Sequence, residues 1–362
     1  MGKKVVVGMS GGVDSSVAAY LLKEQGYEVI GVTMQIWQSE TQCEVEKKGG
    51  CCGISAVEDA RRVAEVLDIP YYVMNFRAEF KRDVIDYFVR EYRLGRTPNP
   101  CIACNRYVKW EALLTRSLML GADYIATGHY ARVLTLENGR YALASSKTVA
   151  KDQSYALYNL TQRQLAHTLM PIGEYEKPEV RAIAAAAGLP VAAKPDSQEI
   201  CFVPDGDYAH FIDESTGERA LPGNFVRADG TVLGEHKGLT HYTVGQRKGL
   251  GIAFGEPMYV IELRPEQNEV VLGTGDEVYA EELLAGDVNW MAVAPPPAGE
   301  TLCCRAKIRY NHGGADCSVT VLPDGKIRVA FPTPQRAVTP GQAVVLYTDS
   351  GAVLGGGTIE AE

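Results

Sequence analysis

Through residues 1–205 the sequence alternates short, β-branched apolar runs with longer helical segments. The expected strands are 4–9, 28–34, 71–76 and 123–127, and the expected helices are 15–25, 56–67, 81–92 and 105–120. Strands separated by helices of this length need crossover connections, which place the strands parallel in one sheet. We therefore predict an α/β fold with a doubly wound parallel sheet.

After residue 205 the helical periodicity fades, and glycines, prolines and short alternating strands take over. Residues 258–273 (MYVIELRPEQNEVVLG) are typical of a β-hairpin that turns at 265–268. Beyond residue 280, short strands joined by tight turns indicate a small barrel. The predicted domains are the parallel-sheet domain at 1–205, a small mixed, mainly β central domain at 206–279, and a C-terminal β-barrel at 280–362.

Composition restricts the cellular setting and the partners. No apolar run approaches the roughly 18 residues of a membrane span, and MGKKVVVGMSGG leads straight into a strand rather than a signal peptide. We therefore expect a cytoplasmic protein with no membrane partner. Nine cysteines, an odd number, do not indicate a disulfide framework there; they indicate metal-binding, redox-active or nucleophilic roles. The net charge of −9 gives no sign of RNA, so any RNA contact must use local basic groups.

A glycine-rich loop joins the first expected strand to the first expected helix: Gly8, Met9, Ser10, Gly11, Gly12, Val13, Asp14 and Ser15. Glycines let backbone N–H groups turn inward around a phosphate, and the start of the helix adds partial positive charge. Asp14 can reach a magnesium ion or cap the helix. The loop has neither the lysine of a Walker-type loop nor the GxGxxG spacing. The structural alternative is a tight turn capped by Asp14.

The segment SGGVDS resembles the PP-loop of ATP pyrophosphatases, which cleave ATP between the α- and β-phosphates and adenylate a substrate oxygen. Further segments are GRTPNPCIACN (95–105), GADYIATGHYAR (121–132), KDQSYAL (151–157), KPDSQEICFVPDGDY (194–208), GLTHYTVGQRKGLGI (238–252) and VTPGQAV (338–344). Together they resemble bacterial tRNA-specific 2-thiouridylases over essentially the whole chain. The resemblance implies an adenine-nucleotide-binding domain, the cofactors ATP and Mg²⁺, and 2-thiolation of the wobble uridine (position 34) of tRNA.

The chemistry of thiolation explains why two cysteines are needed. Adenylation of the C2 carbonyl oxygen makes it a leaving group, a cysteine persulfide supplies sulfur, and a second thiol releases the product and leaves a disulfide. By resemblance, Cys104 is the nucleophile, Cys201 carries the persulfide, and the two form a transient disulfide. Cys104 is expected at the start of a helix, which lowers the pKa of a thiol. The sulfur must come from a partner, either a persulfide-donating sulfurtransferase or a cysteine desulfurase.

The chain departs from the family at one position. Where the family usually has Asn-Pro-Asp, with the acidic residue on the target base, this chain has Asn99-Pro100-Cys101. Cys101 forms a C-x-x-C pair with Cys104, and with Cys201 it offers three thiols for a [4Fe–4S] cluster. An iron–sulfur route is therefore an alternative to the persulfide relay, which we favour because it needs only the two matched cysteines.

Other site residues are carried over by resemblance. Met34 and Gly128 stand at expected strand ends, where open parallel sheets bind nucleotides. Lys151 and Arg309 suit phosphates, Gln153 suits a base edge, and Tyr310 can stack on a base. The residues implied to contact tRNA are Asn99, Pro100, Cys101, His129, Lys151, Asp152, Gln153, Arg309, Tyr310 and Gln342. Two other functions stay open: a PP-loop synthetase that delivers ammonia, and a catalytically silent RNA-binding protein.

Overall fold

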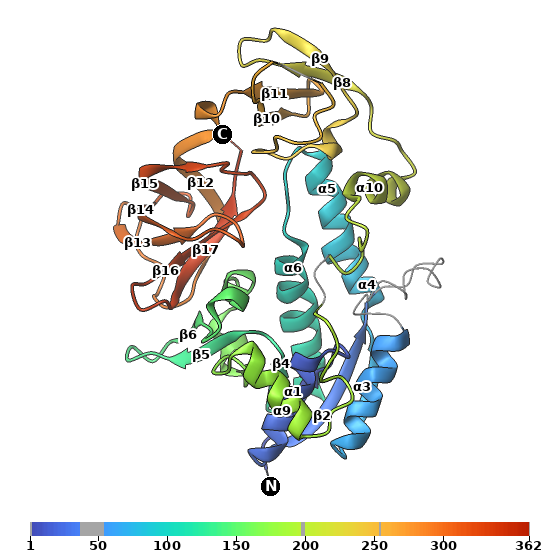
Figure 1. The fold of residues 1–362 in the computed structure, drawn as a ribbon. Coiled ribbons are helices and arrows are strands. Elements are labelled where there is room, and N and C mark those ends of the chain that lie inside the picture. The colour runs from blue at the N-terminus through green and yellow to red at the C-terminus, as the bar shows by residue number, and fades with distance from the viewer. Residues whose placement is uncertain (1, 37–53, 197–199, 253–254, 362) are drawn as a thin grey trace.

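The structure is a computed structural model that describes residues 2–36, 54–196, 200–252 and 255–361 (Figure 1). Cys43, Cys51 and Cys52 lie outside the described residues. Within these ranges, no helix has the length and apolar character to cross a membrane. The chain forms an α/β unit, a small sheet with one helix, and a closed barrel.

Five parallel strands form the sheet of the α/β unit, in the order β3-β2-β1-β4-β7. They are β1 (Lys4–Gly8), β2 (Glu28–Gln35), β3 (Tyr71–Asn75), β4 (Tyr124–Thr127) and β7 (Thr168–Leu169). In β1, Val5 and Val7 pack into one core and Val6 into another, so the strand is buried on both faces. The predicted doubly wound parallel sheet is confirmed.

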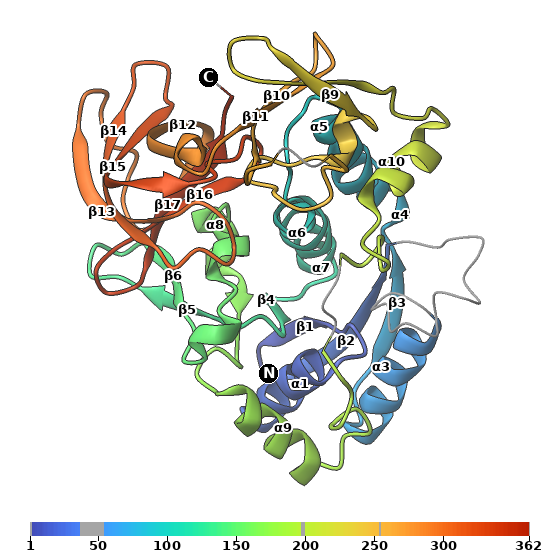
Figure 2. The same ribbon diagram turned by 45° about the horizontal axis from the view of Figure 1, so that its top comes forward.

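Helices cover both faces of this sheet (Figure 2). One face carries α1 (Val13–Glu24), α3 (Ile54–Val66) and α9 (Lys177–Ala186), whose apolar residues share a core with Val5 and Val7. The other face carries α4 (Arg77–Phe80), the π-helical η2 (Lys81–Ile85), α5 (Asp86–Arg93), α6 (Pro100–Ala103), the π-helical η3 (Cys104–Leu113) and α7 (Leu114–Met119). Helices α6, η3 and α7 follow one another without a break.

The start of this last helical run corrects one prediction. The sequence predicted a helix from residue 105, with Cys104 at its first turn, but the helix begins at Pro100. The Asn99 side chain accepts hydrogen bonds from the N–H groups of Cys101 (3.1 Å) and Ile102 (3.4 Å), and Pro100 takes the first position. An Asn cap followed by proline is a strong helix start, because proline has no N–H to satisfy. Cys104 therefore lies one turn inside the helix and begins a π-helical segment, a geometry found often at functional sites.

A hairpin that the sequence analysis did not anticipate extends the α/β unit towards the barrel (Figure 1). Its strands are β5 (Ala131–Thr135) and β6 (Tyr141–Ser145), and short helices follow it at η4 (Val149–Lys151), η5 (Ser154–Leu157) and α8 (Gln162–Ala166). Arg140 in the turn donates hydrogen bonds to the carbonyls of Trp290 (3.1 Å) and Met291 (2.9 Å). The hairpin thus fastens the α/β unit to the barrel.

The central unit holds a four-stranded sheet in the order β10-β11-β8-β9. Its elements are α10 (Tyr208–Thr216), β8 (Gly223–Val226), β9 (Val232–His236), η6 (Leu239–His241), β10 (Tyr259–Arg264), β11 (Glu269–Gly273) and η7 (Asp276–Val278). Strands β10 and β11 pair antiparallel around the turn at 265–268. The predicted hairpin at this turn is confirmed.

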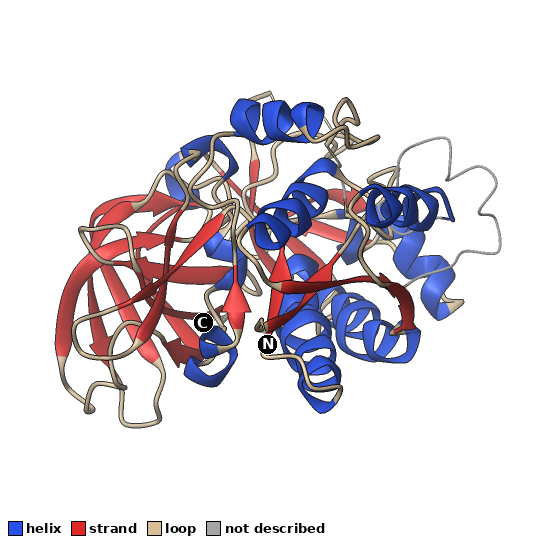
Figure 3. Cartoon of the chain, turned by 90° about the horizontal axis from the view of Figure 1, so that it is seen from below, coloured by secondary structure: helices blue, strands red, loops and turns tan. Residues whose placement is uncertain are grey.

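The C-terminal unit is a closed six-stranded barrel in the order β12-β15-β14-β13-β16-β17 (strands in red in Figure 3). Its strands are β12 (Tyr279–Trp290), β13 (Thr301–Lys307), β14 (Ala315–Val321), β15 (Ile327–Arg336), β16 (Ala343–Tyr347) and β17 (Val353–Ile359). Buried Val319, Val329 and Val344 belong to its core. The predicted C-terminal β-barrel is confirmed, and closure leaves no unpaired strand edge in it.

Candidate active site

A cavity of about 350 Å³ opens at the carboxyl edge of the parallel sheet, where such sheets bind ligands. Predicted site residues that line it are Gly8, Met9, Ser10, Asp14, Ser15, Met34, Pro100, Cys101, Cys104, Gly128, His129, Gln153 and Cys201. The predicted phosphate loop therefore shares one cavity with Cys101 and Cys104 of a single helix and with the distant Cys201. Gly11, Gly12 and Val13 belong to the same loop but do not line the cavity.

The loop leaves the start of α1 open to an anion. Gly12 is the N-cap of α1, and among the described residues no side chain caps this helix. Ser15 Oγ accepts from Ser10 N (3.2 Å) and donates to the Gly12 carbonyl (3.3 Å), which closes the loop on itself. The alternative of a tight turn capped by Asp14 is wrong, because Asp14 lies inside the first turn. The first N–H groups of α1 fit a phosphate.

Two glycines are required by close approach. Gly11 has a φ of 69°, and a Cβ there would collide with the Ala56 carbonyl oxygen. At Gly128, at the end of β4, a Cβ would lie 2.5 Å from Ser15 N. At Gly12 the nearest atom to a Cβ is Ser10 Oγ, at 3.5 Å. The fold therefore needs Gly11 and Gly128, whereas it does not need Gly12.

This contrast yields a prediction on the phosphate loop. We expect Gly128→Ala to lower the free energy of unfolding by about 1–3 kcal/mol, because β4 must move away from α1. Gly12→Ala should cost less than about 1 kcal/mol and still weaken ATP binding, because its methyl group would lie 3.5 Å from the hydroxyl oxygen of Ser10, which lines the cavity. Urea unfolding and ATP titration of both variants check this. If Gly12→Ala binds ATP with the parental affinity, the start of α1 is not part of the phosphate-binding site.

The charged groups behind the loop were missed by the sequence analysis. Asp14 accepts hydrogen bonds from Tyr130 (2.8 Å) and Lys177 (2.8 and 2.9 Å), and Lys177 also binds Asp196 (2.8 Å). Asp196 lies in KPDSQEICFVPDGDY (194–208), one of the segments that resemble the family, so the sequence contained a signal for this residue. No motif marked Lys177.

The predicted magnesium ligand Asp14 is paired with a lysine in this structure. Both carboxylate oxygens of Asp14, which was predicted to reach Mg²⁺, accept from Lys177. Across the described ranges, no three His, Cys, Asp or Glu side chains are placed to hold a metal ion. That statement includes Cys101, Cys104 and Cys201, which share the cavity without forming such a group.

The three cysteines differ in exposure and in what holds them. Cys101 is exposed, whereas Cys104 and Cys201 are half-buried. Next to Cys201, the ring of the buried Phe202 packs edge-on against Phe80 of α4 and Phe88 of α5. The centroid of the Phe202 ring lies 5.7 Å from that of Phe80 and 5.3 Å from that of Phe88. This aromatic cluster fixes Cys201 at the cavity beside the helix of Cys104.

A lysine and a histidine complete the wall near Cys104. Lys109 Nζ donates to Asn105 Oδ1 (2.8 Å) and lies 3.4 Å from His129 Nε2. Burial and the nearby ammonium group of Lys109 hold the pKa of His129 well below its usual value. His129 is therefore neutral at pH 7, with Nε2 accepting from Lys109 and Nδ1–H donating to Thr127 Oγ1 (2.7 Å). Lys109, which the sequence analysis also missed, adds positive charge to the cavity.

The segment 151–153, predicted to contact tRNA, separates into three roles. Lys151 is exposed and pairs with Asp196 (3.0 Å). Asp152 is only 8% exposed, and its carboxylate accepts from Ser154 Oγ (2.7 Å), so it orders the turn from inside. Gln153 lines the cavity, and its Oε1 accepts from Tyr130 N (2.9 Å).

The predicted tRNA residues of the barrel lie outside the cavity. Arg309 donates to the Arg336 carbonyl (2.9 Å). Tyr310 is 41% exposed, with its ring edge-on to Tyr155, which leaves one face for a base. Gln342 Nε2 donates to the Thr97 carbonyl (2.8 Å). This gives Gln342 a role within the fold, since it holds the loop that precedes the helix of Cys104.

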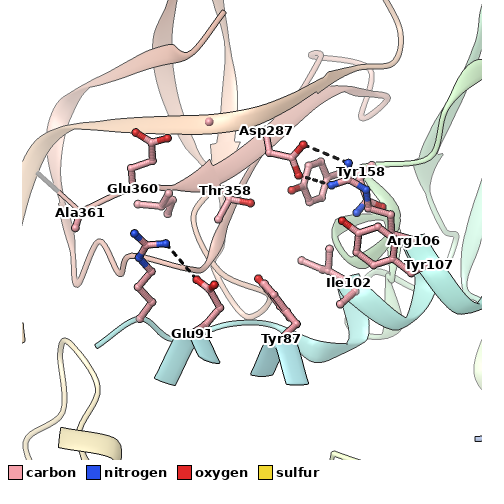
Figure 4. Close-up of a pocket in the computed structure, with 15 residues that line it drawn as sticks. Tyr87, Glu91, Ile102, Arg106, Tyr107, Tyr158, Asp287, Thr358, Glu360 and Ala361 are labelled. Atoms are coloured by element: carbon pink, nitrogen blue, oxygen red, sulfur yellow. Dashed lines mark hydrogen bonds and ion pairs between the residues drawn. The ribbon is translucent and has the colours of Figure 1, made fainter. Parts of the chain in front are cut away.

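The barrel also contacts the helix of Cys104 at Arg106, two residues beyond this cysteine (Figure 4). A second cavity of about 450 Å³ separates them, and across it Arg106 donates two hydrogen bonds to Asp287 of β12. Asp287 has a φ of 47°, a strained value for a residue with a side chain. Barrel contacts at Thr97 and Arg106 thus bracket Cys104, so the barrel fixes the position of this cysteine.

Known proteins resemble this chain along its length. Family models described as tRNA methyl transferase HUP domain, tRNA methyl transferase PRC-barrel domain and aminomethyltransferase beta-barrel domain match residues 3–205, 209–274 and 280–359. The tRNA-specific 2-thiouridylase MnmA of Lachnoclostridium phytofermentans is 67% identical over 357 residues, which cover 99% of each chain. The proteins of the same name from Acetivibrio thermocellus and Clostridium kluyveri are 58% and 55% identical, and the alignments cover 99% and 100% of each chain.

Proposed function

Since this chain belongs to the tRNA-specific 2-thiouridylase family, we propose that it uses ATP to replace the C2 oxygen of the wobble uridine of tRNA with sulfur. It is an enzyme, a tRNA-uridine 2-sulfurtransferase. The observation that carries the proposal is the single cavity that holds the phosphate loop together with Cys104 and Cys201. Activation by ATP and transfer of sulfur need these groups within reach of one substrate atom.

The first step in the proposed mechanism is adenylation. The loop Gly8–Ser15 would hold the triphosphate of ATP, and Met34 and Gly128 would hold the adenine, so that the uridine C2 oxygen can attack the α-phosphate. Pyrophosphate leaves, and the C2–O bond now carries AMP as its leaving group. Lys109 supports this step because it offsets negative charge on the cavity wall.

Sulfur transfer follows. The terminal sulfur of a Cys201 persulfide attacks C2 and AMP departs, which leaves the base joined to Cys201 through two sulfurs. The Cys104 thiolate then attacks the Cys201 sulfur, the pair of electrons of the broken S–S bond goes to the base sulfur, and 2-thiouridine is released. A Cys104–Cys201 disulfide remains, and an external thiol has to reduce it before the next turnover.

The chemistry of the cavity favours sulfur over methyl transfer. Two of the matching family models carry the words methyl transferase, whereas the relatives reported above are thiouridylases. A methyl transfer needs neither a phosphate loop nor facing cysteines. The rival synthetase that delivers ammonia leaves Cys104 and Cys201 without a role.

The partners follow from the same reaction. A wobble uridine cannot react within a base stack, so it must turn out into the cavity, with the central unit and the barrel holding the rest of the tRNA. A persulfide-donating sulfurtransferase or cysteine desulfurase has to load Cys201. Mg²⁺ would enter as the ion that ATP carries on its phosphates. The reaction belongs in the cytoplasm, where tRNA and ATP meet.

Lys151 gives a test of tRNA binding. We expect Lys151→Ala to weaken binding and to flatten the dependence of log Kd on log salt by roughly one counterion equivalent, because one phosphate contact is lost. Titrations of tRNA at several salt concentrations measure the slope, and Lys81→Ala, an exposed lysine paired with Asp86, is the control. An unchanged slope removes Lys151 from the phosphate contacts.

The proposed function is tested by mass spectrometry of tRNA from cells that lack this protein. We expect 2-thiouridine to disappear from the wobble position, to return with the parental gene and to stay absent with Cys104→Ser. Undiminished 2-thiouridine in the deleted strain overturns the proposal.

A further inference from the structure

The phosphate loop lacks a positive side chain. Between Gly8 and Ser15, Asp14 is the charged residue, and it lines the cavity. Its carboxylate has the same sign as the triphosphate of ATP, and in a half-enclosed cavity like charges repel more strongly than in bulk water. A cation from another part of the chain must therefore offset Asp14 before a polyphosphate can bind.

Lys177, at the first position of α9, meets this need. Its Nζ lies 2.8 Å from one carboxylate oxygen of Asp14 and 2.9 Å from the other. The Lys177 side chain is 13% exposed, so water screens this pair little. The Tyr130 hydroxyl donates to Asp14 as well, and the Tyr130 ring centroid lies 5.7 Å from Lys177 Nζ.

Asp196 holds Lys177 from the other side. Its carboxylate binds Lys177 (2.8 Å), Lys151 (3.0 Å) and Arg181 (3.0 Å). Burial opposes ionisation of Asp196, but the hydrogen bonds from Lys177 and Lys151 outweigh it and keep its pKa below the usual range. Asp196 is thus charged at pH 7 and orients Lys177 towards the loop.

The other nearby lysines do not offset Asp14. Lys194 Nζ donates to the Gly11 carbonyl (3.0 Å) and to Asp59 (2.7 Å), so a carboxylate of its own balances its charge. Lys109 stands on the helix of Cys104 and binds Asn105 and His129.

We infer that Lys177 is a positioning residue for ATP, which offsets the charge of Asp14 and thereby makes the phosphate loop accept a polyphosphate. The inference rests on the proposed function for the identity of the nucleotide. In Walker-type proteins a lysine inside the loop meets the phosphates. Here the charge comes from α9, 163 positions further along the chain than Asp14.

Binding of a nucleotide series to the full-length protein tests the inference. In Lys177→Met we expect ATP to bind about 10- to 100-fold more weakly, AMP only a few-fold more weakly, and adenosine as before, because repulsion from Asp14 grows with the charge of the ligand. Lys177→Arg should keep most of the affinity. Lys147→Met is the matched control, since Lys147 is half-exposed and pairs with Glu179 of α9, the helix that carries Lys177.

A double variant separates charge from packing. Adding Asp14→Asn to Lys177→Met removes the repelling carboxylate, so ATP affinity should recover by about tenfold over Lys177→Met alone. Thermal unfolding of each variant confirms that it is folded, and Lys177→Gln replaces Lys177→Met if the latter is not. Parental ATP affinity without Lys177, or an equal loss for adenosine and ATP, overturns the inference. Because these titrations contain no tRNA, a failure to thiolate tRNA would overturn the proposed function and leave the role of Lys177 untouched.

Discussion

Cys104→Ser and Cys201→Ser are each expected to reduce tRNA thiolation to background, whereas Cys101→Asp should retain activity. A serine hydroxyl neither carries a persulfide nor opens one, so the relay stops at a different step in each variant. In Cys201→Ser no sulfur reaches the uridine, and in Cys104→Ser the base stays joined to Cys201. The measurement is ATP-dependent formation of 2-thiouridine on a tRNA transcript, with Cys303→Ser, an exposed cysteine of the barrel, as control.

The iron–sulfur alternative predicts a different pattern. A cluster held by Cys101, Cys104 and Cys201 would be weakened or altered by Cys101→Asp, although a carboxylate can still replace one ligand. It would also be removed by iron chelation. If thiolation by anaerobically purified protein vanishes on chelation and returns with a reconstituted cluster, the relay is wrong.

Asp14→Ala is expected to lower adenylation by at least about a hundredfold while tRNA binding survives. Asp14 holds Lys177 and Tyr130 at the phosphate loop. Without its carboxylate these hydrogen bonds are lost, and the first turn of α1, which lines the cavity at Asp14 and Ser15, is no longer held in place. ATP–pyrophosphate exchange measures adenylation, and a filter-binding titration measures tRNA affinity. Parental rates of pyrophosphate exchange in Asp14→Ala would contradict the assignment of the loop Gly8–Ser15 as the phosphate-binding loop.

The control for this prediction is Asp213→Ala. Asp213 Oδ1 accepts a hydrogen bond from the backbone N–H of Ala220 in the central unit (3.0 Å), and Asp213 does not line the cavity. It should leave pyrophosphate exchange unchanged, so that a loss in Asp14→Ala reports on the loop rather than on the removal of any carboxylate.

The sheet and the phosphate loop were predictable from sequence because both are local signals. An apolar run such as KVVVG followed by SGGVDS and an apolar helix fixes a strand, a turn and a helix within some 20 residues. The placement of Met34 and Gly128 at one sheet edge followed as well, since parallel strands end on the same side.

Residues whose role depends on tertiary contacts could not be predicted. Nothing near Lys177 in sequence shows that its ammonium group meets Asp14, because the packing of α9 against α1 brings them together. Likewise, the barrel contact of Gln342 with Thr97 joins residues 245 positions apart.

The helix start was predictable but was misread. Asn99-Pro100 is a capping residue followed by proline at the first helical position, whereas the sequence analysis began the helix at residue 105 and carried both residues over as tRNA contacts. The side chain of Asn99 is engaged with two backbone N–H groups. Asn99 therefore fixes the start of the helix that carries Cys101 and Cys104.

The central claim, ATP-dependent sulfur transfer from Cys201 to the uridine with release of the product by Cys104, is tested most directly by a single turnover. Protein loaded with a persulfide on Cys201 is mixed with ATP and unmodified tRNA without reductant, and peptides and nucleosides are quantified by mass spectrometry. The account predicts one 2-thiouridine for each newly formed Cys104–Cys201 disulfide, and neither product when ATP is omitted. Formation of 2-thiouridine without that disulfide, or without ATP, would contradict it.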